Sequence, residues 1–494
     1  MEQINEKHRT ILERIAYAAM LERGLLPDFS EKELAELERI QKPAILSGEP
    51  IVDLTDLLWV SIDNDDSMDL DQTTTAEALP DGNTRIYVAV ADVDALVKKG
   101  TQLDGHAQHN TTTVYTAARI FPMLPEKLST NLTSLNYDSD RVSMVIEMVI
   151  KPDGSLHEGK VYQALTRNYA KLAYNSVAAW LDEEGPMPEA IAAVPGLEEN
   201  IRLQDQVAQK MKKLRHAHGA LSLETIETRA VFSEDQVEAL EEEERNRAKE
   251  LIENFMVAAN GVTARFLDKK NFPSIRRVVR VPKRWERIVN IAADFHYDLP
   301  QTPNSLALEE FLVKQKAADP LRFPDLSLTI IKLMGAGEYV AEIPGSGVPG
   351  HFGLAVRDYA HSTAPNRRYP DLITHRLLKA ALKDAPVPYS NAELQELAAH
   401  CTEAEDAANK VERQVEKSAA ALLLKSHIGE RFEAIVTGAA QKGTWVRLLK
   451  IPVEGKLVQG MKGVDVGDRV RVQLIDVNVE KGYIDFRKVK PAKH

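Results

Sequence analysis

The 494-residue sequence contains a single cysteine, Cys401, and no long apolar run. One cysteine excludes an intramolecular disulfide and a cysteine-rich zinc site, which favours a reducing compartment. No stretch approaches the ~18 consecutive apolar residues that predict a membrane-spanning helix. Residues 1–20 lack the apolar centre of a secretory signal. We therefore expect a cytoplasmic protein that does not enter a membrane.

Positive charge is also scarce, because 62 Lys and Arg residues face 74 Asp and Glu residues. The formal net charge of −12 excludes a uniformly basic coat for nucleic acid but leaves room for a local basic patch. No glycine-rich GxxxxGK[ST] loop occurs, so a P-loop nucleotide hydrolase is not expected. The length corresponds to roughly three domains.

The N-terminal segment, residues 1–48, is predicted to be helical. Apolar residues recur at helical spacing between Ile11 and Ala19, and Ser30 with Glu33 forms a capping box that opens a second helix. Two short helices around a break are typical of a helix-turn-helix and equally of an ordinary helical hairpin.

The central segment, residues 49–428, mixes strands and helices. Runs rich in β-branched residues predict strands. These runs are 57–63, 85–93 and a hairpin at 142–166 with Asp153-Gly154 at its turn. Farther on, we expect a charged helix that starts in the four glutamates at 241–244, and a long helix over 391–425.

The C-terminal segment differs in charge from the rest. Residues 431–494 carry 13 Lys or Arg and 7 Asp or Glu. Their short alternating runs, separated by glycines, predict a small antiparallel barrel. With Trp445, Tyr483 and Phe486, a basic barrel suits an OB-fold that stacks bases, although a barrel without a ligand has the same pattern.

An acidic loop, residues 61–72, lies between two predicted strands. It holds Asp63, Asp65, Asp66, Asp69 and Asp71. These carboxylates repel one another unless a partner offsets their charge, and Mg²⁺ and Mn²⁺ prefer oxygen ligands. A calcium loop of the EF-hand type is excluded, because Met68 and Thr74 stand where glycine and glutamate are required. A solvated acidic turn is the alternative.

A second motif, residues 359–382, places Arg367 and Arg368 just before Pro370, in the first turn of a predicted helix. Backbone N–H groups at a helix start, together with guanidinium groups, predict a phosphate site. An exposed loop with two arginines is the alternative. A cation-holding loop combined with such a site suits phosphoryl transfer, in which the metal activates water and arginine stabilises developing charge.

Together, SIDNDDSMDLDQ and YAHSTAPNRRYPDL resemble the two hallmark motifs of the ribonuclease II family, whose catalytic module is called RNB. Residues 110–136 and 253–260 resemble further blocks of that family, and the C-terminal segment resembles its OB-fold of the ribosomal protein S-one type. The resemblance implies a multidomain α+β chain in three parts. These are a helix-turn-helix-like domain at 1–48, an RNB catalytic domain at 49–428 and an OB-fold barrel at 429–494. Because few residues precede the acidic motif, we expect a compact bacterial member without N-terminal cold-shock domains.

Membership would imply a processive, metal-dependent 3′→5′ exoribonuclease that hydrolyses single-stranded RNA to nucleoside 5′-monophosphates. The expected cofactor is Mg²⁺, with Mn²⁺ as a substitute, and the expected state is a monomer. The resemblance assigns catalytic and metal-binding roles to Asp63, Asp69 and Asp71. Gln72 stands where the family has a fourth aspartate; its amide could ligate the metal but carries no charge and cannot act as a base. A catalytically weak or inactive RNA-binding protein is therefore the alternative.

The resemblance also implies residues that contact substrate. Arg367 would contact the scissile phosphate, with Arg368 beside it. Tyr115 would stack on the 3′-terminal base, and Phe272 would hold the other end of the stacked bases. Glu412 would line the catalytic end, although its spacing also fits an ordinary exposed charge on a helix.

Overall fold

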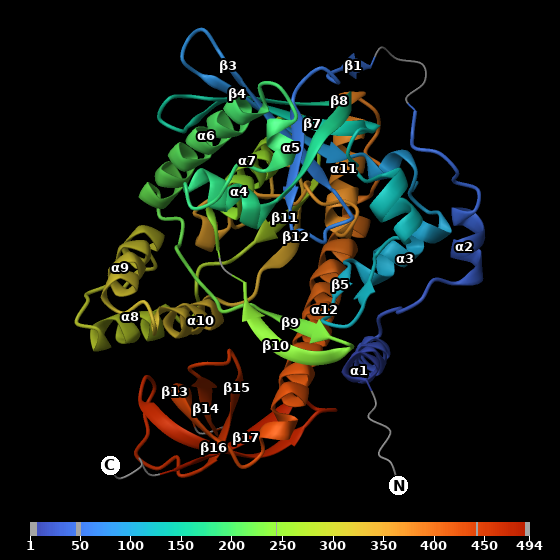
Figure 1. Ribbon diagram of the computed structural model, residues 1–494. Coiled ribbons are helices and arrows are strands. Elements are labelled where there is room, and N and C mark those ends of the chain that lie inside the picture. Colours follow the sequence, from blue (N-terminus) through green and yellow to red (C-terminus); the bar gives the residue numbers. More distant parts are fainter. Residues whose placement is uncertain (1–6, 46–50, 244, 441–442, 490–494) are drawn as a thin grey trace.

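The computed structural model describes residues 7–45, 51–243, 245–440 and 443–489. Figure 1 shows a large body of sheet and helices at the top and a small barrel at the bottom. The long helix α12 (Asn391–Leu424) runs from the body to the barrel. None of the helices within the described ranges combines the length and apolar character needed to cross a bilayer.

The body is built on a six-stranded sheet with the order β1-β8-β2-β3-β4-β7. The strands are β1 (Val52–Asp53), β2 (Trp59–Asp63), β3 (Gln72–Ala78), β4 (Thr84–Ala91), β7 (Asp140–Ile150) and β8 (Leu156–Ala173). Strands β7 and β8 form the predicted hairpin. The first part of β8 pairs with β7 and its last part runs parallel to β2, so the sheet curls back on itself. This pairing places Asp63 opposite Ala173.

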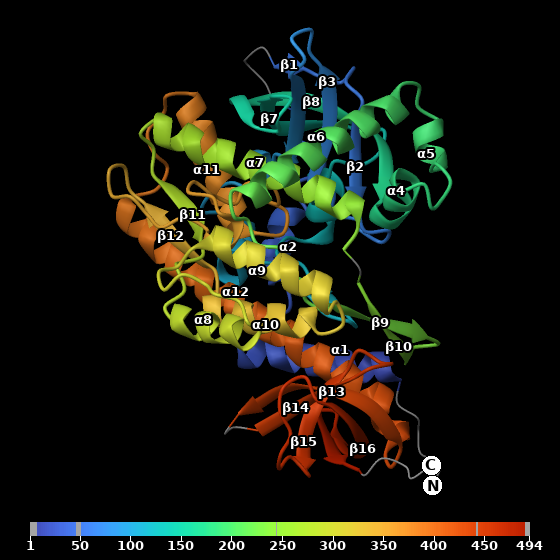
Figure 2. The same ribbon diagram turned by 90° about the vertical axis from the view of Figure 1, so that its left-hand side faces the viewer.

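Helices cover the sheet and bury its apolar side chains. They are α3 (Gln102–Asn110), α4 (Tyr174–Leu181), α5 (Glu189–Ala192), α6 (Leu197–Ala217), α7 (Arg247–Lys269) and α11 (Tyr369–Leu382). Figure 2 shows α6 and α7 lying across the strands. Trp59, Ile86 and Phe255 are fully buried in the resulting core, which also takes in residues of α11 and α12.

The N-terminal helices α1 (His8–Glu22) and α2 (Glu31–Leu37) are buried by different parts of the chain. Leu12 and Ile15 of α1 share a core with α12 and a ribbon of two strands, β9 (Thr228–Ser233) and β10 (Gln236–Glu242). Helix α2 begins at the predicted capping box and packs on α3. The two helices therefore do not share a core of their own.

The predicted helix start at 241–244 is wrong. Glu241 and Glu242 belong to β10, and the helix α7 begins at Arg247; residue 244 lies outside the described residues. Tertiary packing overrides the helical preference of glutamate here, because Leu240 of the same strand is buried against the end of α12.

A helical unit lies between the body and the barrel. It consists of α8 (Trp285–Asp294), α9 (Ser305–Ala318) and α10 (Phe323–Met334), with a core around Phe311. A pair of strands, β11 (Ser274–Val278) and β12 (Glu338–Glu342), connects it to the body. Arg447 of the barrel bonds Asp325 of α10 at 2.9 Å, which ties the unit to the barrel.

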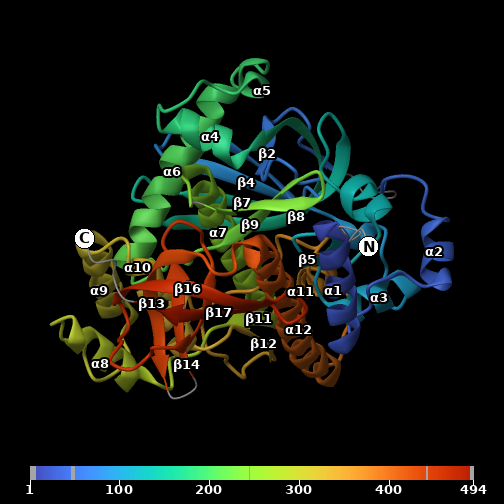
Figure 3. The same ribbon diagram turned by 60° about the horizontal axis from the view of Figure 1, so that its bottom comes forward.

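The C-terminal strands form a closed barrel in the order β13-β14-β15-β17-β16 (Figure 3). The predicted barrel is confirmed, but it is not wholly antiparallel, because β15 pairs with β17 in parallel. They are β13 (Arg431–Ala440), β14 (Gly443–Leu448), β15 (Glu454–Gln459), β16 (Arg469–Asn478) and β17 (Tyr483–Lys488). Ala421 and Leu424 of α12 pack into the barrel core. Phe486, which the sequence suggested for base stacking, is fully buried in that core, whereas Tyr483 is 61% exposed.

Candidate active site

The acidic loop and the arginine loop meet where β2 ends and α11 begins. Residues 111–135 hold both loops in place through backbone bonds. The N–H of Thr113 donates to the carbonyl of Arg367 at 3.0 Å, and the N–H of Leu135 donates to the carbonyl of Leu70 at 2.9 Å. This segment carries the strands β5 (Val114–Tyr115) and β6 (Ile120–Phe121). The block at residues 110–136 therefore holds the acidic loop and the arginine loop next to each other.

Asp71 is the most buried carboxylate of the acidic loop, with 2% of its surface exposed. One of its oxygens accepts the backbone N–H of Asn366 at 2.9 Å, and the other accepts Nε of Arg367 at 3.3 Å. Burial raises the pKa of Asp71 to about 7, and the charge of Asp69 adds to this shift although Arg367 opposes it. The site thus holds more negative charge than Arg367 offsets.

Asp63 and Asp69 complete the acidic cluster. Asp63 ends β2 and accepts the backbone N–H of Asn64 at 2.8 Å and the hydroxyl of Ser67 at 3.0 Å. Burial raises the pKa of Asp63. Burial alone would lower the pKa of Arg367, but the neighbouring acidic groups, chiefly Asp71, raise it overall. All three carboxylates therefore lie within electrostatic range of one guanidinium group.

Tyr115 connects the acidic loop to α12. Its hydroxyl donates to Asp69 at 3.0 Å, and its backbone N–H donates to the carboxylate of Glu412 at 2.8 Å. The residue remains 39% exposed, so part of it is accessible to a ligand. Glu412 therefore belongs to the site and is not an ordinary exposed charge of the helix.

Three of the expected site residues do not join this cluster. Arg368 bonds Asp371 at 2.8 Å in the first turn of α11. Phe272 packs against the main core at the end of α7. Gln72 begins β3 and is buried, but none of the contacts among the described residues joins its side chain to the three aspartates.

Two residues of the site were missed by the sequence analysis. The pKa of Tyr174 is raised by burial and by the charge of Asp63, which places its hydroxyl near the cluster. It follows Ala173, the partner of Asp63 in the parallel strand pair, and no sequence motif indicates that pairing. Asn366 donates its backbone N–H to Asp71, and its buried Nδ2 has no hydrogen-bond partner in the described structure. An amide donor is thus left beside Arg367.

The donor set fits a hard divalent cation, because the cluster offers carboxylate oxygens in excess of positive charge. One oxygen of Asp69 nevertheless accepts a hydrogen bond from Tyr115, and both oxygens of Asp71 accept hydrogen bonds from Asn366 and Arg367. Over the described ranges, no three His, Cys, Asp or Glu side chains converge closely enough to hold a metal ion. A cation would therefore compete with protein donors for these carboxylates.

The sheet, the acidic loop and the arginine loop together define an RNB domain. Residues 51–384 match the family described as RNB domain, and residues 430–489 match the RNase II-type exonuclease C-terminal S1 domain. Because the first match covers well over half of the chain, the protein belongs to the RNB-domain family.

Named relatives agree with this assignment. Ribonuclease R of Escherichia coli (strain K12) is 32% identical over 94% of this chain and 60% of its own length. Ribonuclease R of Aquifex aeolicus is 30% identical over 97% of this chain and 71% of its own length. The structure of Mycoplasma genitalium RNase R in complex with ribose methylated single-stranded RNA superimposes with a TM-score of 0.86 at 22% identity, covering 98% of this chain and 78% of that one. The chain thus spans about 60% of the length of the Escherichia coli relative.

Proposed function

We propose that this protein is a processive, metal-dependent 3′→5′ exoribonuclease that hydrolyses single-stranded RNA to nucleoside 5′-monophosphates. The observation that carries the proposal is the contact between buried Asp71 and Arg367 in a chain with an RNB domain. In the proposed reaction, Asp71 would bind the metal ion and Arg367, beside it, would bind the phosphate. Ribonuclease R relatives support the same activity. We further propose that it acts in the cytoplasm as a monomer.

Mg²⁺ is the proposed cofactor, with Mn²⁺ as a substitute, and Asp63, Asp69 and Asp71 would hold it with Gln72. The ion would supply a polarised phosphate and an activated water. Its positive charge would also oppose the effect of burial and of the charge of Asp69, which together raise the pKa of Asp71. Gln72 brings one charge less than an aspartate, which favours weaker ion binding.

The chain's own residues would position the substrate. Arg367 would donate to the scissile phosphate and stabilise the charge that develops on it. Tyr115 would present its ring to the 3′-terminal base while Asp69 and Glu412 hold the residue at both ends. Phe272 and Arg368 keep their proposed roles in binding RNA, at a greater distance from the carboxylates.

The neutral Gln72 favours a second candidate function, that of a catalytically weak or inactive RNA-binding protein. Such a protein would keep the basic barrel and the ring of Tyr115 but would not cleave the phosphodiester bond. Both functions predict RNA binding, so cleavage alone separates them.

A time course on 5′-labelled single-stranded RNA tests the proposal, with Mg²⁺, with Mn²⁺ and with EDTA, beside DNA of the same sequence. We expect RNA alone to shorten to a small labelled end product, and EDTA to stop the reaction. Binding without shortening in either metal would instead identify the inactive RNA-binding protein.

A further inference from the structure

Thr133 and Ser134 are two buried hydroxyl residues near the end of the block at residues 110–136. They follow the short π-helix η2 (Lys127–Leu132), a kind of turn that is often found at functional sites. Thr133 is 5% exposed and Ser134 is fully buried. Because buried hydroxyl groups need hydrogen-bond partners, the partners of these two residues show what they hold in place.

Ser134 bonds the acidic loop. Its hydroxyl oxygen accepts the backbone N–H of Leu70 at 2.9 Å and lies 3.2 Å from the carbonyl oxygen of Met68. Leu70 directly precedes Asp71 in the chain. Since a buried N–H without an acceptor costs free energy, the hydroxyl of Ser134 fixes the backbone on one side of Asp71.

Thr133 bonds the arginine loop. Its hydroxyl donates to the side-chain oxygen of Asn366 at 2.5 Å. The carbonyl oxygen of Leu128 lies 2.9 Å from the same hydroxyl, but it already accepts the backbone N–H of Thr133 at 3.1 Å. Because a hydroxyl has a single proton, that proton is left for Asn366. Within the described ranges, the side chain of Asn366 makes no other hydrogen bond, so Thr133 is its one hydrogen-bonded anchor there.

Both bonds lie one residue away from the groups of the candidate site. The backbone N–H of Asn366 donates to one oxygen of Asp71 at 2.9 Å, and Arg367, the next residue, donates Nε to the other oxygen at 3.3 Å. Ser134 and Thr133 therefore hold, from consecutive positions, the residue before Asp71 and the residue before Arg367. Among the contacts of the described residues, neither hydroxyl bonds Asp71 or Arg367 itself.

We propose that Thr133 and Ser134 are positioning residues, which set the distance and orientation between the Asp71 carboxylate and the Arg367 guanidinium group. Hydrolysis requires these two groups in one arrangement, and a displacement of about 1 Å can slow a reaction about 100-fold. The effect should appear in the rate of hydrolysis and not in RNA affinity. The inference rests on the proposed function for the reaction, whereas the hydrogen bonds do not depend on it.

The test replaces Thr133, because valine removes its hydroxyl with little change in the shape of the side chain. Thr133→Val should slow single-turnover hydrolysis of saturating 5′-labelled RNA in Mg²⁺ about tenfold. Thr133→Ser keeps the hydroxyl and should hydrolyse at close to the wild-type rate. RNA affinity in EDTA should be the same in all three proteins. An unchanged rate in Thr133→Val, or a loss of affinity equal to the loss of rate, would overturn the proposal.

Thr74→Val is the matched control. Thr74 is 1% exposed, and its hydroxyl donates to the side-chain oxygen of buried Gln204 at 2.7 Å, which joins β3 to α6. The variant therefore loses the same kind of buried hydrogen bond as Thr133→Val. It should lower the urea midpoint about as much but leave the rate of hydrolysis unchanged. Equal slowing in both variants would indicate a general loosening of the fold and would contradict a positioning role.

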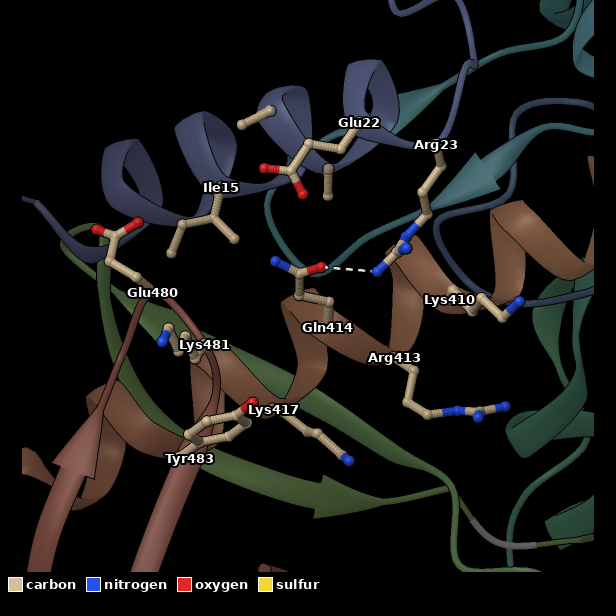
Figure 4. A pocket seen from close by; sticks show the side chains of 12 residues that line it. Ile15, Glu22, Arg23, Lys410, Arg413, Gln414, Lys417, Glu480, Lys481 and Tyr483 are labelled. Carbon is tan, nitrogen blue, oxygen red and sulfur yellow. Dashed lines mark hydrogen bonds between the residues drawn. The ribbon is translucent and has the colours of Figure 1, made fainter.

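A second control lies on α12, two residues after Glu412. In a groove of about 600 Å³ between α1, α12 and the barrel, Arg23 donates to the side-chain oxygen of Gln414 at 3.0 Å (Figure 4). Among the described contacts, neither residue bonds the acidic loop or the arginine loop. Gln414→Met should therefore leave the single-turnover rate at saturating RNA unchanged. Slowing equal to that of Thr133→Val would count against the proposal.

A double-mutant cycle with Asp71→Asn tests whether Thr133 acts through Asp71. Once the charge of the carboxylate is lost, its exact position matters little to the reaction. Thr133→Val should therefore slow the Asp71→Asn variant less than about twofold. A further loss of about tenfold would mean that Thr133 acts on another group, and the proposal would fail.

Hydrogen exchange separates this inference from the proposed function. In EDTA, the backbone N–H of Asn366 should exchange about tenfold faster in Thr133→Val than in the wild type, and Thr74→Val should not change it. Mass spectrometry of peptides that cover residues 362–369 measures this exchange. Unchanged exchange in Thr133→Val would overturn the positioning role whatever the activity. A wild-type protein that does not hydrolyse RNA would refute the exoribonuclease, and the exchange result would still decide whether Thr133 holds Asn366 against Asp71.

Discussion

Replacing Asp71 with asparagine should stabilise the metal-free protein at high pH. The side chain is buried and its pKa is raised from 3.8 to about 7, chiefly by burial. A group with a raised pKa in the folded state contributes stability that is fully present below its unfolded pKa and lost as the pH rises through its folded pKa. Asparagine is neutral at every pH, so Asp71→Asn removes this dependence.

The size of the effect follows from the two pKa values. Between about pH 5 and about pH 8, wild-type protein in EDTA should lose about 3 kcal/mol of unfolding free energy that the Asp71→Asn variant retains. The difference is measured by urea denaturation of both proteins at the two pH values. The neutral side chain can still accept the N–H of Asn366, so the local backbone should hold.

The same variant should lose activity. Without the carboxylate, both the metal site and the partner of Arg367 are weakened, and loss of one such electrostatic group lowers kcat by about 100- to 1000-fold. RNA affinity should change little. If the free energy of unfolding depends on pH in the same way in both proteins, Asp71 is not a buried carboxylate that titrates in this range. Near-normal turnover in Asp71→Asn would refute its role in catalysis.

The remaining predictions concern a base contact, a metal ligand and a buried ion pair. Tyr115→Ala should lengthen the final undegraded oligonucleotide on denaturing gels, whereas Tyr115→Phe, which keeps the ring but loses the bond to Asp69, should not. Gln72→Asp should lower the Mg²⁺ concentration needed for half-maximal hydrolysis, because it adds a charged oxygen ligand. Arg376→Met should cost about 3–5 kcal/mol in urea denaturation, since it removes the buried ion-pair partner of Asp104 and leaves Asp94 to Lys379.

Each of these has a result that would contradict it. An end product of unchanged length in Tyr115→Ala would show that the ring does not stack on the 3′-terminal base. An unchanged Mg²⁺ requirement in Gln72→Asp would place that residue outside the metal site. Arg202→Met breaks an exposed pair with Glu198 and should cost less than about 1 kcal/mol; an equal loss in Arg376→Met would contradict the buried network.

Local signals in the sequence predicted local structure well. The capping box at Ser30 opens α2, and Asp153-Gly154 lies in the turn between β7 and β8. Both depend on interactions between residues close in the chain. The predicted start of α7 was wrong because Glu241 lies in a strand that pairs with its neighbour β9 and packs on the end of α12, which is distant in the sequence.

The same distinction between local and long-range interactions applies to the candidate site. Asp63, Asp69 and Asp71 lie in one loop, so the sequence alone indicated an acidic cluster. The contacts of Tyr115 with Asp69 and Glu412 join segments far apart in the chain. The family resemblance assigned Tyr115 and Glu412 to the site but did not indicate these contacts. Neither the sequence motifs nor the family resemblance indicated Tyr174, because its position depends on a parallel strand pair that carries no motif.

The continuous helix α12 sets the direction in which each of its side chains, and the barrel at its end, project from the helix axis. Its 34 residues extend about 51 Å, and successive residues turn by about 100°. Glu412, which bonds Tyr115, and the two residues buried in the barrel, Ala421 and Leu424, all project from this one helix. Inserting a single residue just after Glu412 would turn the barrel by about 100° relative to the acidic cluster. The angular position of the barrel relative to the acidic cluster is therefore set by the number of residues between Glu412 and Leu424.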